Sequence, residues 1–376
     1  MTDRQSGEML PRDRIKVAMV TNIPAPYRLQ VFEHVVMHRD LDFCVFYCSG
    51  REPDREWDLR DSTVKQVFFK EKFFTYRGKF VHCNPDAWSA LATFRPDVVI
   101  TTGFNPTFLV AYAYARLHGV RHIAMTDGTD TTEATLSAVH RFVRRRVYAG
   151  TKAFIGASLG SFALYRSYGI PDEKMFQSHL CANNADFAEL RQVQGKRYDF
   201  VFSARFVPGK NPLFALEVSQ TVAKRLGRKV SILLLGSGEM ADEMHKAAEA
   251  MRTEVDATFA GFVKQAELPA FYASASVFLF PTQLDTWGVV ANEACAAGLP
   301  VIVTPMAGVA HELVVHDDNG FVLPLNVQQW SDACVALLTQ PTLYERFASR
   351  SVKRVKPYTY KNAADGIYAA VRCAVC

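Results

Sequence analysis

The chain has 376 residues, 49% of them hydrophobic, and a formal net charge of +5 at pH 7. This length exceeds the roughly 250 to 300 residues that one hydrophobic core usually serves, so we expect two domains. The first residues, MTDRQSGEMLPRDR, are polar and charged, and we expect no signal peptide there. The longest uncharged tract, residues 98–115, contains Thr, Gly, Asn and Pro, which indicates a strand, a loop and a helix instead of a membrane span.

The first predicted unit is a strand, a proline-containing turn and a helix. Residues 14–20 (RIKVAMV) are typical of a strand, and a helix is expected over residues 29–37. Pro24 and Pro26 restrict the turn between them and remove two backbone donors, so Arg28 and the remaining N–H groups would make any contact. Arg28 is therefore a candidate site residue, and an ordinary loop cation is the alternative.

Two further strands end in polar turns. Residues 96–103 (PDVVITTG) and 122–128 (HIAMTDG) are apolar runs that close on a glycine, and the first leads into a helix predicted over residues 107–117. A polar residue at the carboxyl end of such a strand points to where parallel sheets bind ligands. Asp127 is the leading candidate here and Asp130 the second; an Asp-Gly pair that only forms a turn is the alternative.

Two segments of the first half interleave cations with aromatic residues. They are residues 70–80 (KEKFFTYRGKF) and residues 140–148 (HRFVRRRVY). Such segments bind anionic membrane surfaces, but solvated helix faces and loops have the same composition, so both interpretations stay open. Nucleic-acid binding is disfavoured because no DNA- or RNA-binding motif accompanies the charge.

The cysteines and one polar stretch bear on compartment and domain organisation. Eight cysteines are scattered without the paired spacing of a metal site, so we expect free thiols in a reducing cytosol and no bound metal. Residues 189–197 (ELRQVQGKR) are polar and contain a glycine. The domain boundary is best placed there.

The second half opens with a strand that leads into two cations. Residues 198–204 (YDFVFSA) predict the strand, and Arg205 and Lys210 follow within RFVPGKNP. A guanidinium and an ammonium group aimed at a departing diphosphate stabilise the negative charge that develops on it. The pair therefore predicts a phosphate-binding loop, and two solvated loop cations are the alternative.

Glycine-containing turns follow the next two predicted strands. Gly236 and Gly238 come after residues 231–235; a lone Gly-x-Gly is weak evidence, but its position fits a loop that passes close to a nucleotide. Phe262 and Val263 end a strand predicted over residues 259–263. An ordinary turn and a plain core strand are the alternatives.

The most informative segment is FLFPTQLDTWGVVANEACAAGLPVIVT. It predicts a strand ending at Phe280, a helix over residues 289–297 and another strand from Val301. Asp285 and Glu293 lie eight positions apart across the turn. Free N–H groups near the helix start suit anionic or hydroxyl ligands. The alternative is that Asp285 caps the helix and Glu293 lies on its solvated face.

That arrangement resembles the donor-binding element of retaining GT-B glycosyltransferases of family 4, whose pattern is Glu, seven residues, Glu. The resemblance implies that Asp285 holds the hydroxyls of the transferred sugar and that Glu293 binds the ribose. Asp replaces the first Glu of the pattern, which moves the acceptor oxygens back by about one methylene and weakens the prediction of which sugar is bound. Arg205 and Lys210 match the cations that stabilise the diphosphate.

Other candidates take their roles from the same resemblance. The backbone at Thr286-Trp287-Gly288 and the loop at Gly236 and Gly238 would contact the donor. Phe262 and Val263 would lie where the family recognises the base. Arg28 would lie near the donor phosphates and Asp127 would face the reacting sugar. Residues 305–313 resemble the loop and short helix that close the donor pocket.

The resemblance also implies a fold: an α/β GT-B protein with two doubly wound, Rossmann-like domains facing a cleft. We expect residues 1–190 to form an acceptor-binding domain and residues 198–356 a domain that binds a nucleoside diphosphate sugar. Residues 357–376 would form a terminal helix that crosses back onto the first domain.

The implied activity is transfer of a sugar, with retention, to a hydroxyl of a glycan or lipid-linked acceptor. UDP or GDP is the expected nucleotide, with no cofactor and no metal. The expected setting is bacterial cell-surface polysaccharide synthesis in the cytoplasm, with contact to the inner membrane face left open. Two alternatives remain: an epimerase or hydrolase of the same fold, and a non-catalytic sugar-nucleotide sensor.

Overall fold

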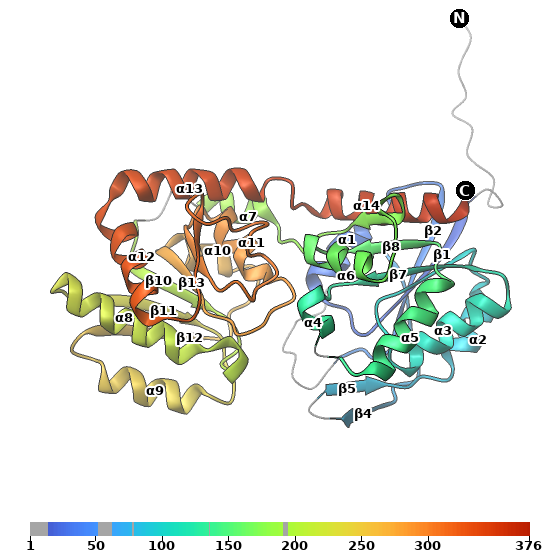
Figure 1. Ribbon diagram of the computed structural model, residues 1–376, viewed down its shortest axis with the longest axis horizontal. Coiled ribbons are helices and arrows are strands. Elements are labelled where there is room, and N and C mark those ends of the chain that lie inside the picture. Colours follow the sequence, from blue (N-terminus) through green and yellow to red (C-terminus); the bar gives the residue numbers. More distant parts are fainter. Residues whose placement is uncertain (1–13, 52–61, 77–78, 135, 191–194) are drawn as a thin grey trace, which may run out of the picture. The chain divides into compact units, whose positions relative to one another are not determined.

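The computed structural model describes residues 14–51, 62–76, 79–134, 136–190 and 195–376 (Figure 1). Residues 77–78 of the first basic stretch and 191–194 of the predicted boundary lie outside these ranges. The chain divides into two compact units. Unit 1 comprises residues 1–180 and 360–376, and unit 2 comprises residues 181–359.

Unit 1 is built around a parallel sheet of seven strands within the described residues, in the order β3-β2-β1-β6-β7-β8-β9. The strands are β1 Ile15–Thr21, β2 Leu41–Tyr47, β3 Lys65–Phe68, β6 Val98–Thr101, β7 Arg121–Thr126, β8 Ala153–Gly156 and β9 Met175–Gln177. A separate antiparallel hairpin joins β4 Phe73–Tyr76 to β5 Lys79–His82. The central strands are nearly continuous apolar runs because both faces of a parallel sheet are covered.

Helices cover that sheet. They are α1 Pro26–Val35, α2 Ala87–Phe94, α3 Pro106–Leu117, α4 Asp130–Ala134, α5 Ala138–Ala149, α6 Leu159–Ser167 and α14 Tyr360–Val375, with a 3-10 turn at Asp172–Lys174. The helices α2 and α3 pack with β1, β2 and β6 in one apolar cluster. The helices α5 and α6 pack with β7 and β8 in another.

The C-terminal helix α14 belongs to unit 1, as predicted. It contacts α1 and the strands β6 to β9. Gly366 allows this close packing, because a Cβ at that position would lie 1.7 Å from the carbonyl oxygen of Gln177. The Tyr368 hydroxyl donates to Asp40 Oδ2 at 2.9 Å. This bond joins the helix to the turn between α1 and β2.

Unit 2 repeats the parallel architecture. Its six-stranded sheet, counted over the described part of the chain, has the order β12-β11-β10-β13-β14-β15. The strands are β10 Tyr198–Ser203, β11 Val230–Leu235, β12 Val255–Gly261, β13 Ala275–Phe280, β14 Val301–Val303 and β15 Gly320–Val322. The helices are α7 Asn184–Leu190, α8 Pro212–Leu226, α9 Ala241–Ala250, α10 Leu268–Ala273, α11 Val289–Ala296, α12 Val327–Thr339 and α13 Pro341–Val355, with a 3-10 turn at Pro208–Lys210.

Both sheets are doubly wound, which confirms the predicted class. In unit 1 the first strand β1 lies between β2 and β6, and in unit 2 the strand β10 lies between β11 and β13. The winding reverses at these two points, and parallel sheets bind ligands at the carboxyl ends of the strands there. The two carboxyl edges are therefore where functional side chains are expected.

Three details differ from the predictions. The helix α1 begins at Pro26 instead of residue 29, because proline without an N–H fits the first turn of a helix. The strand β12 ends at Gly261, whose φ of +68° turns the chain before Phe262 and Val263. Residues 305–313 form turns and isolated bridges and contain no helix, since His311 has a φ of +64°.

Candidate active site

The carboxyl edge of the unit 1 sheet contains a cavity of about 200 Å³ at the ends of β1, β6 and β7. Its walls combine hydroxyl, amide, charged and apolar side chains: Thr21, Asn22, Ile23, Ala25, Tyr27, Arg28, Phe32, Thr102, Met125, Thr126 and Asp127. The two predicted residues Arg28 and Asp127 thus line one cavity. Asp130, the second candidate, is exposed and is not among the lining residues.

Arg28 and Asp127 form an ion pair across this cavity. Arg28 Nη2 donates to Asp127 Oδ1. The Arg28 side chain is 12% exposed, whereas that of Asp127 is 39% exposed. The carboxylate is therefore the more accessible partner. Arg28 Nη1 is buried and has no hydrogen-bond partner among the described residues.

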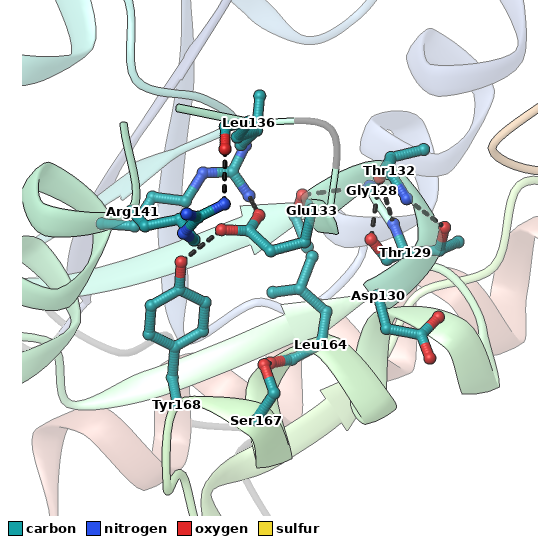
Figure 2. Close-up of polar contacts among 12 residues, drawn as sticks. Gly128, Thr129, Asp130, Thr132, Glu133, Leu136, Arg141, Leu164, Ser167 and Tyr168 are labelled. Carbon is teal, nitrogen blue, oxygen red and sulfur yellow. Dashed lines mark hydrogen bonds and ion pairs between the residues drawn. The ribbon is translucent and has the colours of Figure 1, made fainter. Parts of the chain in front are cut away.

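Hydroxyl groups fix the loop that carries Asp127. Thr126 Oγ1 accepts from the Gly128 backbone N–H at 3.0 Å. Thr129 and Thr132 bond to each other, with the Thr129 N–H donating to Thr132 Oγ1 at 2.8 Å and the Thr132 hydroxyl donating to the Thr129 carbonyl at 2.8 Å. The turn that presents Asp127 to the cavity is thus held by its own threonines (Figure 2).

A buried carboxylate anchors the same loop to the helices behind it. Glu133 is 6% exposed and accepts hydrogen bonds from Arg144 on α5 and from the Tyr168 hydroxyl (Figure 2). Burial, followed by the neighbouring Glu133 carboxylate, raises the pKa of Tyr168 to about 12. This cluster is not evident from the sequence, because Arg144 and Tyr168 are 11 and 35 positions from Glu133 and follow no periodic pattern.

In unit 2 the carboxyl edge brings Lys210 and Asp285 together, although 75 positions separate them. Lys210 Nζ donates to Asp285 Oδ2, and the two side chains are 22% and 20% exposed. The ammonium group also lies 5.9 Å from the centre of the Phe280 ring. The predicted diphosphate-binding cation and the predicted sugar-binding acid are direct partners.

Backbone hydrogen bonds hold the two loops of this pair. The Gln283 N–H donates to the Gly209 carbonyl at 2.9 Å, and the Thr282 hydroxyl donates to the same carbonyl at 3.2 Å. Asp285 is held further by its own backbone, since its carbonyl accepts from the Gly308 N–H at 2.9 Å. The positions of Lys210 and Asp285 are therefore set by two loops that are joined to each other.

In the turn after Asp285, backbone groups instead of side chains are available to a ligand. Asp285 Oδ1 accepts from the Trp287 N–H at 3.1 Å. The Trp287 indole is fully buried and donates to Asn292 Oδ1 at 2.8 Å. Gly288 has a φ of +104° and is the N-cap residue of α11, and a Cβ on it would lie 2.3 Å from the Phe280 ring. Trp287 and Gly288 can thus reach a ligand only through their backbone.

The backbone of Thr286 packs closely against Gly308. A Cβ on Gly308 would lie 2.0 Å from the Thr286 carbonyl oxygen, so the turn and the loop after β14 are in direct contact.

Glu293 lies one turn into α11 and is buried. It is 6% exposed, and its Oε2 accepts from the Tyr272 hydroxyl at 2.8 Å. Burial raises the pKa of Glu293 to about 7, while the hydrogen bond from Tyr272 acts in the opposite direction. The solvated helix face considered as an alternative is therefore wrong.

The glycine loop after β11 packs against the loop that carries Arg205. A Cβ on Gly236 would lie 2.0 Å from the Ala204 carbonyl oxygen, and one on Gly238 would lie 2.5 Å from that of Phe206. The Phe206 N–H donates to the Ser237 carbonyl at 2.7 Å. Both glycines are explained by this backbone approach. Arg205 itself is exposed.

The remaining predicted residues follow β12. Phe262 is 47% exposed, and Val263 is half-buried. Gly261 makes the bend that carries them out of the sheet. An exposed aromatic ring at a strand end is a surface on which a flat ring can stack.

Comparison with known proteins finds a family resemblance in the second half of the chain. The model of the family "Glycosyl transferases group 1" matches residues 186–354. This segment, a little under half of the chain, is similar to members of that family. The match contains Arg205, Lys210, Asp285 and Glu293, whereas Arg28 and Asp127 lie outside it.

Relatives and solved structures extend the comparison. A GDP-mannose-dependent alpha-(1-6)-phosphatidylinositol monomannoside mannosyltransferase of Mycobacterium tuberculosis is 32% identical over 246 residues, 60% of this chain and 62% of the relative. A capsular polysaccharide biosynthesis glycosyltransferase, CapM, of Staphylococcus aureus is 24% identical over 71% of this chain and 68% of its own length. In another relative the chain spans only 44% of the length.

The fold is shared with solved structures at low identity. The crystal structure of HepE from Anabaena in complex with UDP and glucose superposes with a TM-score of 0.72 at 16% identity, covering 96% of this chain and 100% of that one. This likeness confirms the predicted GT-B fold. Within the described residues, no group of three or more His, Cys, Asp or Glu side chains could hold a metal ion, and no helix is long and apolar enough to cross a bilayer.

Proposed function

We propose that this protein is a retaining glycosyltransferase that moves a sugar from a nucleoside diphosphate to a hydroxyl of a glycan or lipid-linked acceptor. The observation that carries the proposal is the Lys210–Asp285 pair at the carboxyl edge of the unit 2 sheet, within the segment that matches the family. Both groups lie where a doubly wound sheet binds its ligand.

The donor would bind to unit 2. Arg205 and Lys210 would face the diphosphate, whose charge grows as the bond to the sugar breaks, so they favour the transition state over the ground state. Glu293 would accept hydrogen bonds from the ribose, and Asp285 from the sugar hydroxyls. The backbone of Thr286, Trp287 and Gly288 would lie beside them.

The base would lie near the end of β12. The exposed ring of Phe262 offers a stacking surface, and the Val263 backbone follows it. The backbone at Gly236 and Gly238 would border the diphosphate through the loop they share with Arg205. UDP and GDP are the nucleotides we propose, in line with the GDP-mannose-dependent relative and the UDP complex of HepE.

The acceptor would bind to the unit 1 cavity. At about 200 Å³ the cavity is smaller than the roughly 300 to 1,000 Å³ typical of drug-sized ligands, so it suits one sugar ring or a smaller group. Asp127 offers an accessible carboxylate for an acceptor hydroxyl. The ion pair with Arg28 holds that carboxylate in place.

The proposed transfer needs few groups beyond the donor-binding and acceptor-binding residues. No side chain among the described residues stands out as a general base, and family chemistry allows the departing phosphate to take the acceptor proton. The phosphate is then both leaving group and base, on the face of the sugar from which it departs. This accounts for retention at the anomeric carbon.

Contact with the inner face of the cell membrane is part of the proposal. On α5 the apolar side chains of Val139 and Phe142 are 70% and 58% exposed, beside exposed Arg141, Arg145 and Arg146. Exposed apolar groups among arginines suit an anionic lipid surface. The hairpin β4–β5 also exposes Phe73 and Phe74, at 37% and 53%.

Such a surface suits a lipid-linked acceptor in cell-surface polysaccharide synthesis. The phosphatidylinositol monomannoside mannosyltransferase and CapM are relatives whose names refer to a lipid acceptor and a capsule.

The test is incubation of the full chain with a panel of labelled nucleotide sugars, with and without a membrane lipid extract. We expect acceptor-dependent product whose new linkage keeps the anomeric configuration of the donor. Isomerised donor would indicate an epimerase instead. Binding without turnover would indicate a sensor, and either result would overturn the proposal.

A further inference from the structure

Lys210 and Asp285, which are proposed to hold the diphosphate and the adjoining sugar of the donor, form a hydrogen bond with each other. Lys210 Nζ donates to Asp285 Oδ2, and Asp285 Oδ1 accepts from the Trp287 N–H at 3.1 Å. Both carboxylate oxygens are therefore engaged by the protein. Lys210 occupies one acceptor position on Oδ2, so a sugar hydroxyl gains fuller access to this oxygen when the ammonium group moves away.

Separating Lys210 from Asp285 is costly unless each charged group finds a new hydrogen-bond partner. Lys210 and Asp285 are 22% and 20% exposed, so separating them leaves two charges with little water to solvate them. Their loops are joined through the Gly209 carbonyl, which accepts from both Gln283 and Thr282. The loops therefore stay together, and the side chains alone can rearrange.

We infer that Lys210 exchanges Asp285 for the donor diphosphate, and that this exchange frees Asp285 for the sugar hydroxyls of the same donor. The inference rests on the proposed function and adds a role to it. Asp285 is a positioning residue for Lys210 as well as a sugar ligand. An intact nucleotide sugar satisfies both charges, whereas a nucleoside diphosphate satisfies Lys210 and leaves Asp285 unpaired.

The exchange gives the product a route out. After transfer the sugar no longer bonds to Asp285, so the carboxylate competes with the diphosphate for Lys210. This competition lets the protein discriminate between the donor and the spent nucleotide. Neutralising Asp285 removes the competitor, so it should tighten the nucleoside diphosphate but not the nucleotide sugar.

The experiment is calorimetric titration of the full chain with UDP and UDP-glucose, and with GDP and GDP-mannose. For whichever pair binds, wild type should bind the sugar form more tightly. Asp285→Asn should bind the nucleoside diphosphate roughly tenfold more tightly than wild type, because a negative charge beside it is lost. Its affinity for the nucleotide sugar should be unchanged or lower. In turnover assays both kcat and donor KM should fall, with stronger inhibition by the product nucleotide.

Matched variants separate this effect from a general change of charge. Asp285→Glu retains the carboxylate and should retain the preference for the sugar form. Asp332→Asn removes the same charge from the exposed Arg225–Asp332 pair of unit 2 and should bind both ligands as wild type does. Asp285→Ser, whose hydroxyl can accept from Trp287, serves if the Asn variant does not fold.

The outcomes are distinct. Equal affinity of wild type for both ligands, or an Asp285→Asn variant that binds the nucleoside diphosphate no more tightly, overturns the exchange and leaves the proposed function standing. If no nucleotide binds to wild type at all, the proposed function fails and the exchange with it.

Discussion

Units 1 and 2 place the same kind of pair at the same edge of a doubly wound sheet, but they hold it differently. In unit 2, Lys210 and Asp285 lie on loops joined by backbone hydrogen bonds. In unit 1, Arg28 and Asp127 line a cavity, and the Asp127 loop is fixed by threonine hydroxyls. When backbone hydrogen bonds hold the loops, the position of the pair depends little on neighbouring side chains. When side chains hold a loop, substitution of those side chains can shift the pair.

This difference fits the roles proposed for the two units. Donors share a diphosphate, so one rigid backbone solution serves many members of a family. Acceptors differ, so a pocket shaped by side chains can diverge. The family match to residues 186–354, which leaves out Arg28 and Asp127, follows the same division.

The largest expected effect comes from removing a unit 2 cation. Lys210→Ala or Arg205→Ala should lower kcat by about 10²- to 10³-fold, as the loss of one transition-state donor usually does. Arg225→Ala, an exposed cation of the same unit, is the control and should turn over normally. The measurement is initial-rate transfer at saturating donor. A Lys210 variant with full turnover would contradict the assignment of the donor diphosphate to unit 2.

The glycine-built backbone of unit 2 should be intolerant of a single methyl group. Gly236→Ala places a Cβ 2.0 Å from a carbonyl oxygen at a φ of +137°. Overpacking and backbone strain of about 1 to 3 kcal/mol each predict a loss of roughly 4 kcal/mol in the free energy of unfolding. Gly209→Ala meets open space and should change stability by less than about 1 kcal/mol. Denaturant unfolding compares the two, and equal stabilities would contradict the packing argument.

The buried acid of unit 2 should make stability depend on pH. Burial raises the pKa of Glu293 from 4.5 to about 7, so the folded chain holds this proton more tightly than the unfolded chain. The stabilisation is fully present below about pH 4.5 and is lost as pH rises through about 7. At 1.36 kcal/mol per pKa unit the loss is on the order of 3 kcal/mol.

Glu293→Gln cannot titrate and should lack this component of the pH profile. Urea unfolding of both proteins between pH 5 and 8 measures the difference. Parallel profiles for the two proteins would show that Glu293 is not the group responsible.

The smallest expected effect concerns the surface of unit 1. Each arginine near an anionic bilayer contributes about 1 kcal/mol, so Arg145→Ala should weaken binding to phosphatidylglycerol-containing vesicles by roughly fivefold. Arg252→Ala, on unit 2, should bind as wild type does. Vesicle co-sedimentation reports both. Equal vesicle binding by the two variants would show that Arg145 on α5 does not contribute to membrane binding.

Much of the fold followed from local pattern. The apolar runs at residues 14–20 and 198–204 predicted β1 and β10 to within one residue at each end. Fully buried parallel strands carry such runs because both of their faces are covered. The start of α1 was misplaced because Pro26 was interpreted as part of the turn instead of the first turn of the helix.

The sequence predicted the individual site residues but not which of them bond to each other. The spacing of Asp285 and Glu293 pointed to one strand-turn-helix unit, which the structure contains. That Lys210 bonds to Asp285, and Arg28 to Asp127, depends on which loops the sheet order brings together. The anchor at Glu133 left no trace in the sequence for the same reason.

The most direct test of the account is titration of UDP and GDP into the full chain, with Lys210→Ala and Arg28→Ala beside the wild type. We predict saturable binding of one nucleotide, weakened at least tenfold by Lys210→Ala and little changed by Arg28→Ala. Absence of nucleotide binding in the wild type, or a loss confined to Arg28→Ala, would contradict the assignment of the donor to unit 2.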